Sequence, residues 1–592
     1  MKLLVLFNLI VGITIVRCDI NMGNPRGSNN RCDEASRGRR NANRLFDSQN
    51  NDRGGHNVGS FPGKMYYYAG SKLEIQWANQ HSCNDENNNC NVVIQYMCDE
   101  NLRDGTNTDE APTECDGDCD TNPEYGHHES LTYYEQCASR ERNKGLFVAN
   151  RAGRMGDSAQ STRQNNNGNR HGFECPEERD YYPYFGPTPW KDIAILTSDT
   201  SKCALYHAES QNEKSKWACS LPDEYWESVK GQLLEDDEAP EITLYNDQAS
   251  CEQVQVTLED GTVYNAEWRE FPSHGIAAPE CLEAPWSIDN HQGNTYGGEL
   301  LSYIWTIPDI NEEHCTLRMR YNISTNDFKY WDTDHTKNLD RANGNLGPEE
   351  IYNYLTFNGE TSPRSNKKLE ATRRHYFLRD NPIVDVFDLR TRANKFKLRV
   401  ALNTAQYGRT FQDRSHSFAI KQRPASLTNA NIYNLNVRGK RGNLAQVYPG
   451  FEYDFVPNIL NVDVGDHVHI QWTGSDNNPG NNAGQGARRT DRHNLVQLGL
   501  RPYAEGDTGT KLTLGVNYPR DIGDNFLWGE TENRMKELAF GGYCKPGETL
   551  NDADAYFDFG AAKMSEAGVY HYFCTRNNNF SNRSQKGTIV VN

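Results

Sequence analysis

Alternation between apolar and polar residues predicts β-strands in several separate stretches of the chain. Lys72–Trp77 alternates cleanly, and Asn91–Cys98 is rich in β-branched and aromatic residues, as a buried strand would be. Tyr303–Ile307 and Cys315–Tyr321 have the composition of further strands, the second half-buried. One short helix is expected over 223–234, directly after a proline. The pattern as a whole favours a mostly β protein.

Changes in composition along the chain predict its domain organisation. The chain has 592 residues, a length that corresponds to about three or four domains. An apolar run from Leu3 to Val16 gives residues 1–18 the features of a secretory signal peptide, with cleavage expected after Cys18. We then expect an Asn/Arg/Gly-rich arm over 19–60, a Cys-rich β domain over 61–280, a second β domain over 281–430 and a C-terminal domain over 431–592. The arm either extends freely or packs on a later domain through its basic residues.

The cysteines point to an oxidising compartment. Of the 16 cysteines, twelve lie from Cys83 to Cys315, and Cys544 and Cys574 form a separate pair near the end. Disulfides of this density are typical of secreted chains, and the two even groups suggest pairing within each region. Cys32 is then the odd thiol of the mature chain, and it either stays reduced or bridges two chains in a disulfide-linked dimer.

The charge of the chain narrows the range of partners. Its 81 acidic and 62 basic residues give a formal net charge of −19. Such a charge argues against nucleic acid as a partner, because the phosphates would be repelled. No segment after the leader is apolar for long enough to cross a bilayer, so we expect no membrane insertion. The partner is expected to be an extracellular protein or glycan.

Five C-terminal segments occur in an order that resembles the cupredoxin family. They are Phe455–Val462, Gly465–Trp472, His493–Val496, Gly568–Cys574 and Gly587–Val591. The resemblance implies a Greek-key β-sandwich for this domain. The expected fold class is therefore mostly β, with several β-sandwich-like domains, disulfide-rich loops and a cupredoxin-like C-terminal sandwich.

The resemblance also identifies a copper site, which is incomplete. By resemblance, His493 and Cys574 correspond to two ligands of a blue-copper centre, which needs a second His and usually a Met. The stretch from Thr575 to Arg583, where they should follow, contains neither residue type. We therefore expect no cofactor, with copper held by His493 and Cys574 as the alternative.

Two further features of the C-terminal domain argue against copper. Asn579 and Asn582 begin glycosylation sequons in the stretch where the missing ligands would lie, and Asn322 begins another earlier in the chain. A disulfide between Cys544 and Cys574 would also remove the thiolate that copper requires.

Nearly all of the mature chain resembles one family. The segments that carry this resemblance are Asn24–Arg31, Arg44–Asn51, Glu174–Tyr184 and Gly408–His416. These segments resemble those of the DD-three-three family, which comprises a secreted slime-mould protein and its relatives. The resemblance implies secretion and a cupredoxin-like C-terminal domain. It gives no indication of an activity.

Three functions remain open from the residues. The chain lacks the metalloprotease motif HExxH, the nucleophile motif GxSxG and a phosphate-binding glycine loop. We therefore expect a secreted, extracellular and non-enzymatic glycoprotein that acts as a binding or matrix component. A copper redox protein is one alternative. A carbohydrate-binding protein is the other, because the aromatics of Tyr181–Trp190 suit stacking on sugars, although they equally suit packing over a core.

Overall fold

In this computed structural model, not every part of the chain is described. The described residues are 20–26, 65–79, 83, 88–99, 182–184, 186–229, 248–287, 300–325, 383–385, 397–399, 409–439, 453–474, 491–498, 526–542, 550–575 and 585–592.

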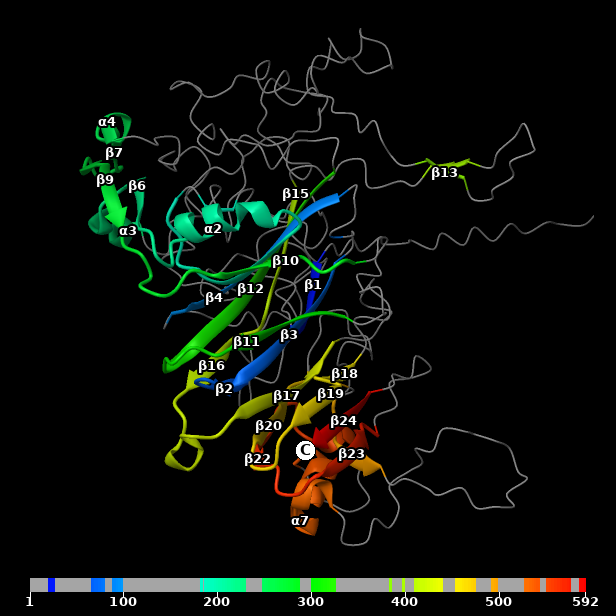
Figure 1. The fold of residues 1–592 in the computed structure, drawn as a ribbon. Coiled ribbons are helices and arrows are strands. Elements are labelled where there is room, and N and C mark those ends of the chain that lie inside the picture. The colour runs from blue at the N-terminus through cyan, green and yellow to red at the C-terminus, as the bar shows by residue number, and fades with distance from the viewer. Residues whose placement is uncertain are drawn as a thin grey trace, which may run out of the picture.

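A central sheet runs through both halves of the described structure (Figure 1). Its strands, in order of pairing, are β11 (Leu301–Thr306), β3 (Lys72–Asn79), β17 (Ile432–Arg438), β20 (His467–Trp472) and β22 (Phe557–Lys563). Two short strands complete it, β1 (Ile20–Asn24) beside the end of β3 and β18 (Asp454–Val456) beside β17. β3 and β17 meet only at Lys72 and Tyr433, so the sheet is narrowest where its two halves join.

Each half of the central sheet is covered by a second sheet. Over the N-terminal half lie β10 (Glu280–Glu283), β5 (Lys191–Thr197), β4 (Asn88–Cys98), β12 (Glu312–Thr325), β16 (Phe418–Lys421) and β2 (Tyr66–Tyr68), with β15 (Arg409–Arg414) also paired to β12. Over the C-terminal half lie β19 (Ile459–Val462), β24 (Lys586–Val591), β23 (Gly568–Phe573) and β21 (Val496–Leu498). The mostly β fold class with a C-terminal cupredoxin-like sandwich is therefore confirmed.

Two separate apolar cores lie between these layers. The N-terminal core includes Ile75, Trp77, Ile94 and Leu317, which alternate along their strands with residues of the opposite face. The C-terminal core contains Val468, Ile470 and Trp472 from alternate positions of β20, together with aromatic residues of β22 and β23. This alternation is the expected signature of strands with one face on a core.

A smaller unit projects from the N-terminal sandwich (Figure 1). Its elements are α3 (Asp223–Ser228), α4 (Gln248–Cys251), β6 (Lys216–Ser220), β7 (Gln255–Thr257), β8 (Val263–Asn265) and β9 (Glu267–Phe271). α3 buries Tyr225 and Trp226, and it ends at Ser228, earlier than the helix expected over 223–234. The remaining described elements are α2 (Cys203–Glu209), α7 (Glu532–Phe540) and the hairpin of β13 (Ile383–Asp385) with β14 (Lys397–Arg399).

Strands from both sides of residue 280 pair with one another. β4 pairs with β12 over its whole length, and β3 pairs with β11. Cys98 and Cys315 lie opposite each other in the β4–β12 register and form a disulfide. The boundary expected between 61–280 and 281–430 therefore falls inside one sandwich.

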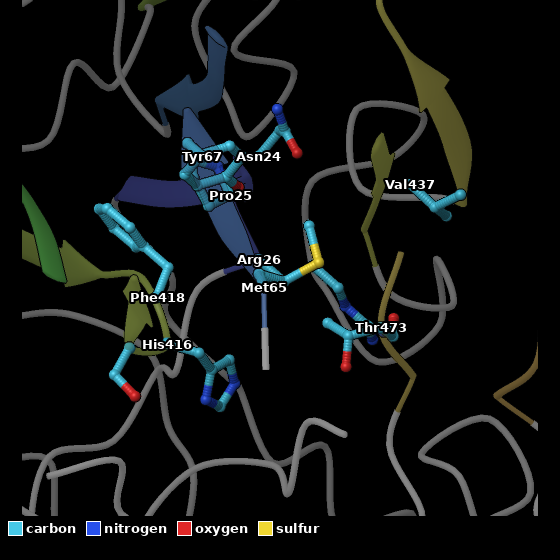
Figure 2. A pocket seen from close by; sticks show the side chains of 10 residues that line it. Asn24, Pro25, Arg26, Met65, Tyr67, His416, Phe418, Val437 and Thr473 are labelled. Atoms are coloured by element: carbon cyan, nitrogen blue, oxygen red, sulfur yellow. The ribbon is translucent and has the colours of Figure 1, made fainter. Parts of the chain in front are cut away.

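The N-terminal segment lies between the two halves. Ile20 and Met22 of β1 belong to the N-terminal core, and Arg26 extends to the C-terminal half. A small pocket opens where the segment meets both halves, and Figure 2 shows Arg26, Tyr67 and Thr473 among the residues around it. The pocket has room for only about one water-sized molecule. The basic arm thus packs on a later domain, at least over its described residues.

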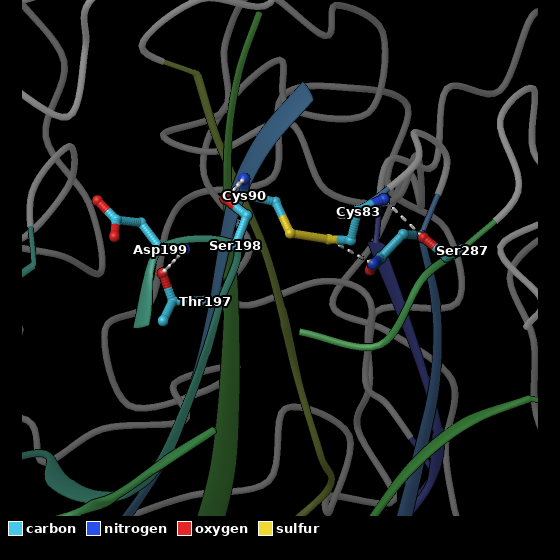
Figure 3. Close-up of a disulfide and its surroundings, with 7 residues drawn as sticks. Cys83, Cys90, Thr197, Ser198, Asp199 and Ser287 are labelled. Carbon is cyan, nitrogen blue, oxygen red and sulfur yellow. Dashed lines mark hydrogen bonds between the residues drawn. A yellow bond between two sulfur atoms is a disulfide. The ribbon is translucent and has the colours of Figure 1, made fainter. Parts of the chain in front are cut away.

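Four disulfides are present in the described residues, all within the region from Cys83 to Cys315. They are Cys83–Cys90, Cys98–Cys315, Cys203–Cys281 and Cys219–Cys251. Figure 3 shows the first of these, where the backbone N–H groups of Cys83 and Cys90 donate to the hydroxyls of Ser287 and Ser198. Cys83 and Cys90 are thereby held against the residues that follow β10 and β5.

Candidate functional site

The two residues expected to bind copper lie at the same end of the C-terminal sandwich. β21 and β23 pair with Val496 opposite Phe573, so the residues just before β21 and just after β23 are close together. Asn494 accepts a hydrogen bond from the backbone N–H of Thr575 (2.8 Å) and donates to its hydroxyl (2.9 Å). His493 and Cys574 therefore lie at the same end of the sandwich.

The imidazole of His493 uses both of its ring nitrogens within the protein. Nε2 lies 2.9 Å from Oδ1 of Asp491, and Nδ1 lies 3.3 Å from Oε1 of Gln585. The ring packs edge-on against Tyr453, with 5.0 Å between ring centroids, and His493 is only 1% exposed. Gln585 also accepts the backbone N–H of Cys574 (3.0 Å), so it lies against both expected ligands.

Arg26 completes this arrangement from the opposite end of the chain. Its guanidinium donates to Oδ2 of Asp491 (2.7 Å) and to the carbonyl of Thr473 (2.7 Å). It also lies 5.8 Å from the ring centroid of Tyr453. Arg26 and Asp491 are almost completely buried. We call Arg26, Asp491, His493 and Gln585 the polar latch, because they join the N-terminal segment to the end of the C-terminal sandwich.

The charges of the polar latch are mutually consistent. Burial lowers the pKa of His493 despite its contact with Asp491, so the ring is neutral and donates through Nε2. Its unprotonated Nδ1 then accepts from the side-chain amide of Gln585, which requires the amide nitrogen, here without a partner, to face the ring. Burial acting alone would raise the pKa of Asp491, but Arg26 and His493 lower it far below its usual range. Burial would likewise lower the pKa of Arg26, but Asp491 raises it. The result is one buried ion pair with a neutral imidazole attached.

The residues at this position do not fit a copper centre. A metal ion at His493 would have to displace either Asp491 or Gln585 from its ring nitrogen. Besides Cys574, the groups around His493 are a guanidinium, an amide and a carboxylate, which do not supply the second imidazole and the thioether of a blue-copper site. Within the described part of the chain, no group of three or more His, Cys, Asp and Glu side chains converges as a metal site.

The other residues expected at sites lie in different surroundings. Cys574 is buried, at 6% exposure. Asn322 is 3% exposed in β12, between β4 and β15, where the folded sheet has no room for a glycan. Cys32, Cys544, Asn579 and Asn582 lie outside the described residues, so the disulfide, dimer and glycan expected there stay predictions.

The described aromatic residues of the stretch expected to stack on sugars, Tyr182, Tyr184 and Trp190, are buried. Trp190 is 0% exposed, and its ring lies between Arg318 (4.1 Å) and Arg414 (4.8 Å). The hydroxyl of Tyr182 donates to Asp192 (2.8 Å), and Tyr184 donates to a buried glutamine. These rings pack over the outer face of the N-terminal sheet and are not available as a stacking surface.

Comparison with known proteins identifies both halves. The DD3-3 N-terminal domain matches residues 18–420, and the DD3-3 cupredoxin-like domain matches residues 430–504 and 530–591. The chain belongs to the DD3-3 family. A solved structure of auracyanin B is similar to part of this DD3-3 chain. The matched region covers 27% of this chain and 88% of the auracyanin B chain, at 13% identity and a TM-score of 0.13. No curated protein matches the chain.

Sequence reasoning missed three members of the polar latch in this DD3-3 protein. Asp491 stands two residues before His493, which was a weak signal for a pair. Gln585 stands two residues before the segment Gly587–Val591, and Arg26 lies in Asn24–Arg31, but an amide and a guanidinium are not copper ligands, so neither carried a signal. Only the fold brings them to His493.

Proposed function

We propose that this protein is a secreted, non-enzymatic extracellular component that acts through binding surfaces or as part of a matrix. The observation that supports this proposal is the polar latch. The end of the sandwich that corresponds to a redox centre is filled by Arg26 and Asp491, and His493 has no ring nitrogen left for a metal. The former ligand position therefore joins two parts of the chain and has no donor set for electron transfer.

Secretion is supported by the covalent chemistry of the chain. Four disulfides in the described residues favour an oxidising compartment. No described helix is both long and apolar enough to cross a bilayer. We expect the chain in the culture medium to begin at Asp19, which N-terminal sequencing tests; a secreted chain that retains the Leu3–Val16 run would contradict the proposal.

The decisive experiment measures copper in the purified full chain, before and after incubation with Cu(II) and removal of excess ion. We expect no stoichiometric copper and no change on His493→Gln substitution. Mapping of thiols tests the expected Cys544–Cys574 disulfide in the same sample. Stoichiometric copper that is lost in His493→Gln, together with an alkylatable Cys574, would instead support the copper redox protein.

The carbohydrate alternative gains no support from the stretch that suggested it. Because Trp190 is enclosed by two arginines, Trp190→Ala should destabilise the fold rather than remove a sugar contact. A glycan array probed with wild type and variant, with unfolding measured in parallel, separates the two. Loss of glycan binding in a variant of unchanged stability would restore this alternative.

A further inference from the structure

A second polar cluster lies along the join between the two sandwiches. β2, an edge strand of the N-terminal sheet, approaches β20 and β22 of the central sheet. The hydroxyl of Tyr66 donates to Oδ2 of Asp558 (2.9 Å) and lies 3.3 Å from the hydroxyl of Tyr68. The other carboxylate oxygen of Asp558 lies 3.2 Å from Nε2 of His469. Two phenols, one carboxylate and one imidazole therefore form a continuous chain of contacts.

The rings of this cluster are packed closely together. The centroid of the His469 ring lies 4.7 Å from that of Tyr66 and 5.2 Å from that of Tyr68, and the two tyrosine rings are 5.3 Å apart. The backbone of Tyr66 is held by the side-chain amide of Gln471, which accepts its N–H and donates to its carbonyl. The four donor groups are thus fixed by two strands of one sheet and by a strand of the other.

The cluster has one buried member and three members that are partly exposed to solvent. His469 is fully buried, whereas Asp558 retains 27% exposure. Tyr66 and Tyr68 are both partly exposed. An ion can therefore reach the phenol and carboxylate oxygens from solvent, while the imidazole approaches from the protein interior.

The spacing of these donors suits a six-coordinate ion. Adjacent ligands of an octahedral ion bound at about 2.1 Å lie about 3.0 Å apart. The contacts between successive donors are 2.9, 3.2 and 3.3 Å. The types of the donors and their charges then determine which ion they suit.

Charge selects the kind of ion. Two phenolates and one carboxylate carry three negative charges, which balance a trivalent cation beside a neutral imidazole. Phenolate oxygen is an established ligand of iron, whereas magnesium and calcium sites use carboxylates, carbonyls and water. Lys421 lies 4.2 Å from the ring centroid of Tyr66, so one positive charge already packs against this side of the cluster.

We propose that Tyr66, Tyr68, His469 and Asp558 form a binding site for ferric iron. Binding breaks the O–H bonds of both tyrosines and releases two protons to solvent, and the iron keeps its oxidation state. Water or a small anion completes the coordination. Burial and the neighbouring Tyr68 and Asp558 raise the pKa of Tyr66, so its proton leaves only when a strongly charged ion takes its place.

The test uses the full secreted chain, stripped of metal and then titrated with ferric nitrilotriacetate. We expect about one iron per chain to remain after gel filtration, with visible absorption and resonance Raman bands of iron-bound tyrosinate. Tyr66→Phe/Tyr68→Phe should abolish the bands and weaken retention by more than the roughly 10–100-fold loss that follows removal of an outer-shell partner. The control Tyr303→Phe removes another hydroxyl that donates to a carboxylate, Glu280 at 2.6 Å, and should leave both readouts unchanged.

Folding and binding are separated by the choice of variants. Phenylalanine keeps the packed rings, and the unfolding free energy and disulfide pattern of each variant are measured alongside. Should the double variant not fold, Tyr68→Phe alone, which removes one partly exposed hydroxyl, serves as the second test and should shift the tyrosinate bands. The proposal is overturned if wild type shows no tyrosinate bands, or if the bands persist in the double variant. The result is independent of the copper experiment at His493.

Discussion

Arg26 places a buried positive charge against a carboxylate that is 465 positions away in the sequence. Removing one member of a buried ion pair leaves the other charge without compensation, which typically costs about 3–5 kcal/mol. We therefore expect Arg26→Met to lower the unfolding free energy by about that amount in denaturant titrations. Arg269→Met removes an exposed arginine from its pair with Asp223 and should cost no more than about 1 kcal/mol. Equal effects of the two substitutions would contradict the latch.

The neutral state of His493 predicts a pH dependence. Its pKa in the folded protein is lowered by burial. Below about pH 6.5 the unfolded chain therefore binds a proton that the folded chain does not, and stability is lost as the pH falls. His493→Gln should reduce the slope of unfolding free energy against pH by up to about 1.4 kcal/mol per pH unit between pH 6.5 and 5. Identical slopes in wild type and variant would show that folding does not lower the pKa of His493.

Asn322 begins a glycosylation sequon, but its position in the fold prevents modification. The sequon is present, but its asparagine is 3% exposed in the middle of β12. A glycan is bulky and hydrated, so it cannot be enclosed between paired strands. Glycopeptide mapping of the secreted chain should find Asn322 unmodified. If Asn322 is occupied, β12 cannot have the register with β4 and β15 described above.

Among the elements, the strands could be predicted from local sequence but their partners could not. The alternation in Lys72–Trp77 and Cys315–Tyr321 reports which face of a strand meets a core, and both strands exist. It does not report that β12 pairs with β4 or that the sheet continues from β3 to β17, because pairing depends on contacts distant in sequence. The boundary expected near residue 280 was placed without this information, whereas the order of the C-terminal segments carried enough of it to predict the cupredoxin-like sandwich.

β1 is the element that sequence analysis represented least well, because five residues in a polar arm carry little periodicity. The structure places Ile20 in the core at 0% exposure, whereas Ile304 of β11 is 62% exposed on the same sheet. Ile20→Ala should therefore cost about 2–5 kcal/mol, and Ile304→Ala should change stability by no more than about 0.5 kcal/mol. Denaturant titrations of the two variants check this. Similar values would mean that β1 does not contribute to the core.

At the scale of the whole molecule, one face of β20 holds the two sandwiches together. His469 and Gln471 face β2, and Thr473, just beyond the strand, accepts from Arg26. The intervening residues Val468, Ile470 and Trp472 face the C-terminal core. Successive side chains of β20 thus point alternately into the core of the C-terminal sandwich and toward the N-terminal sandwich. The polar latch and the proposed iron site lie along the same join.

This shared strand predicts that the two sandwiches unfold as one unit. Loss of β20 would expose the C-terminal core and break the join at once, so neither half should open alone. Hydrogen exchange of the full chain, resolved by peptide, should give β12 and β24 the same opening free energy in wild type. In Arg26→Met the join is weakened, and β24 should then open at a lower free energy than β12. Gln422→Ala, which removes an exposed hydrogen bond to Asp309, should keep the two values equal. Unequal values in wild type would show that the central sheet does not couple the two halves.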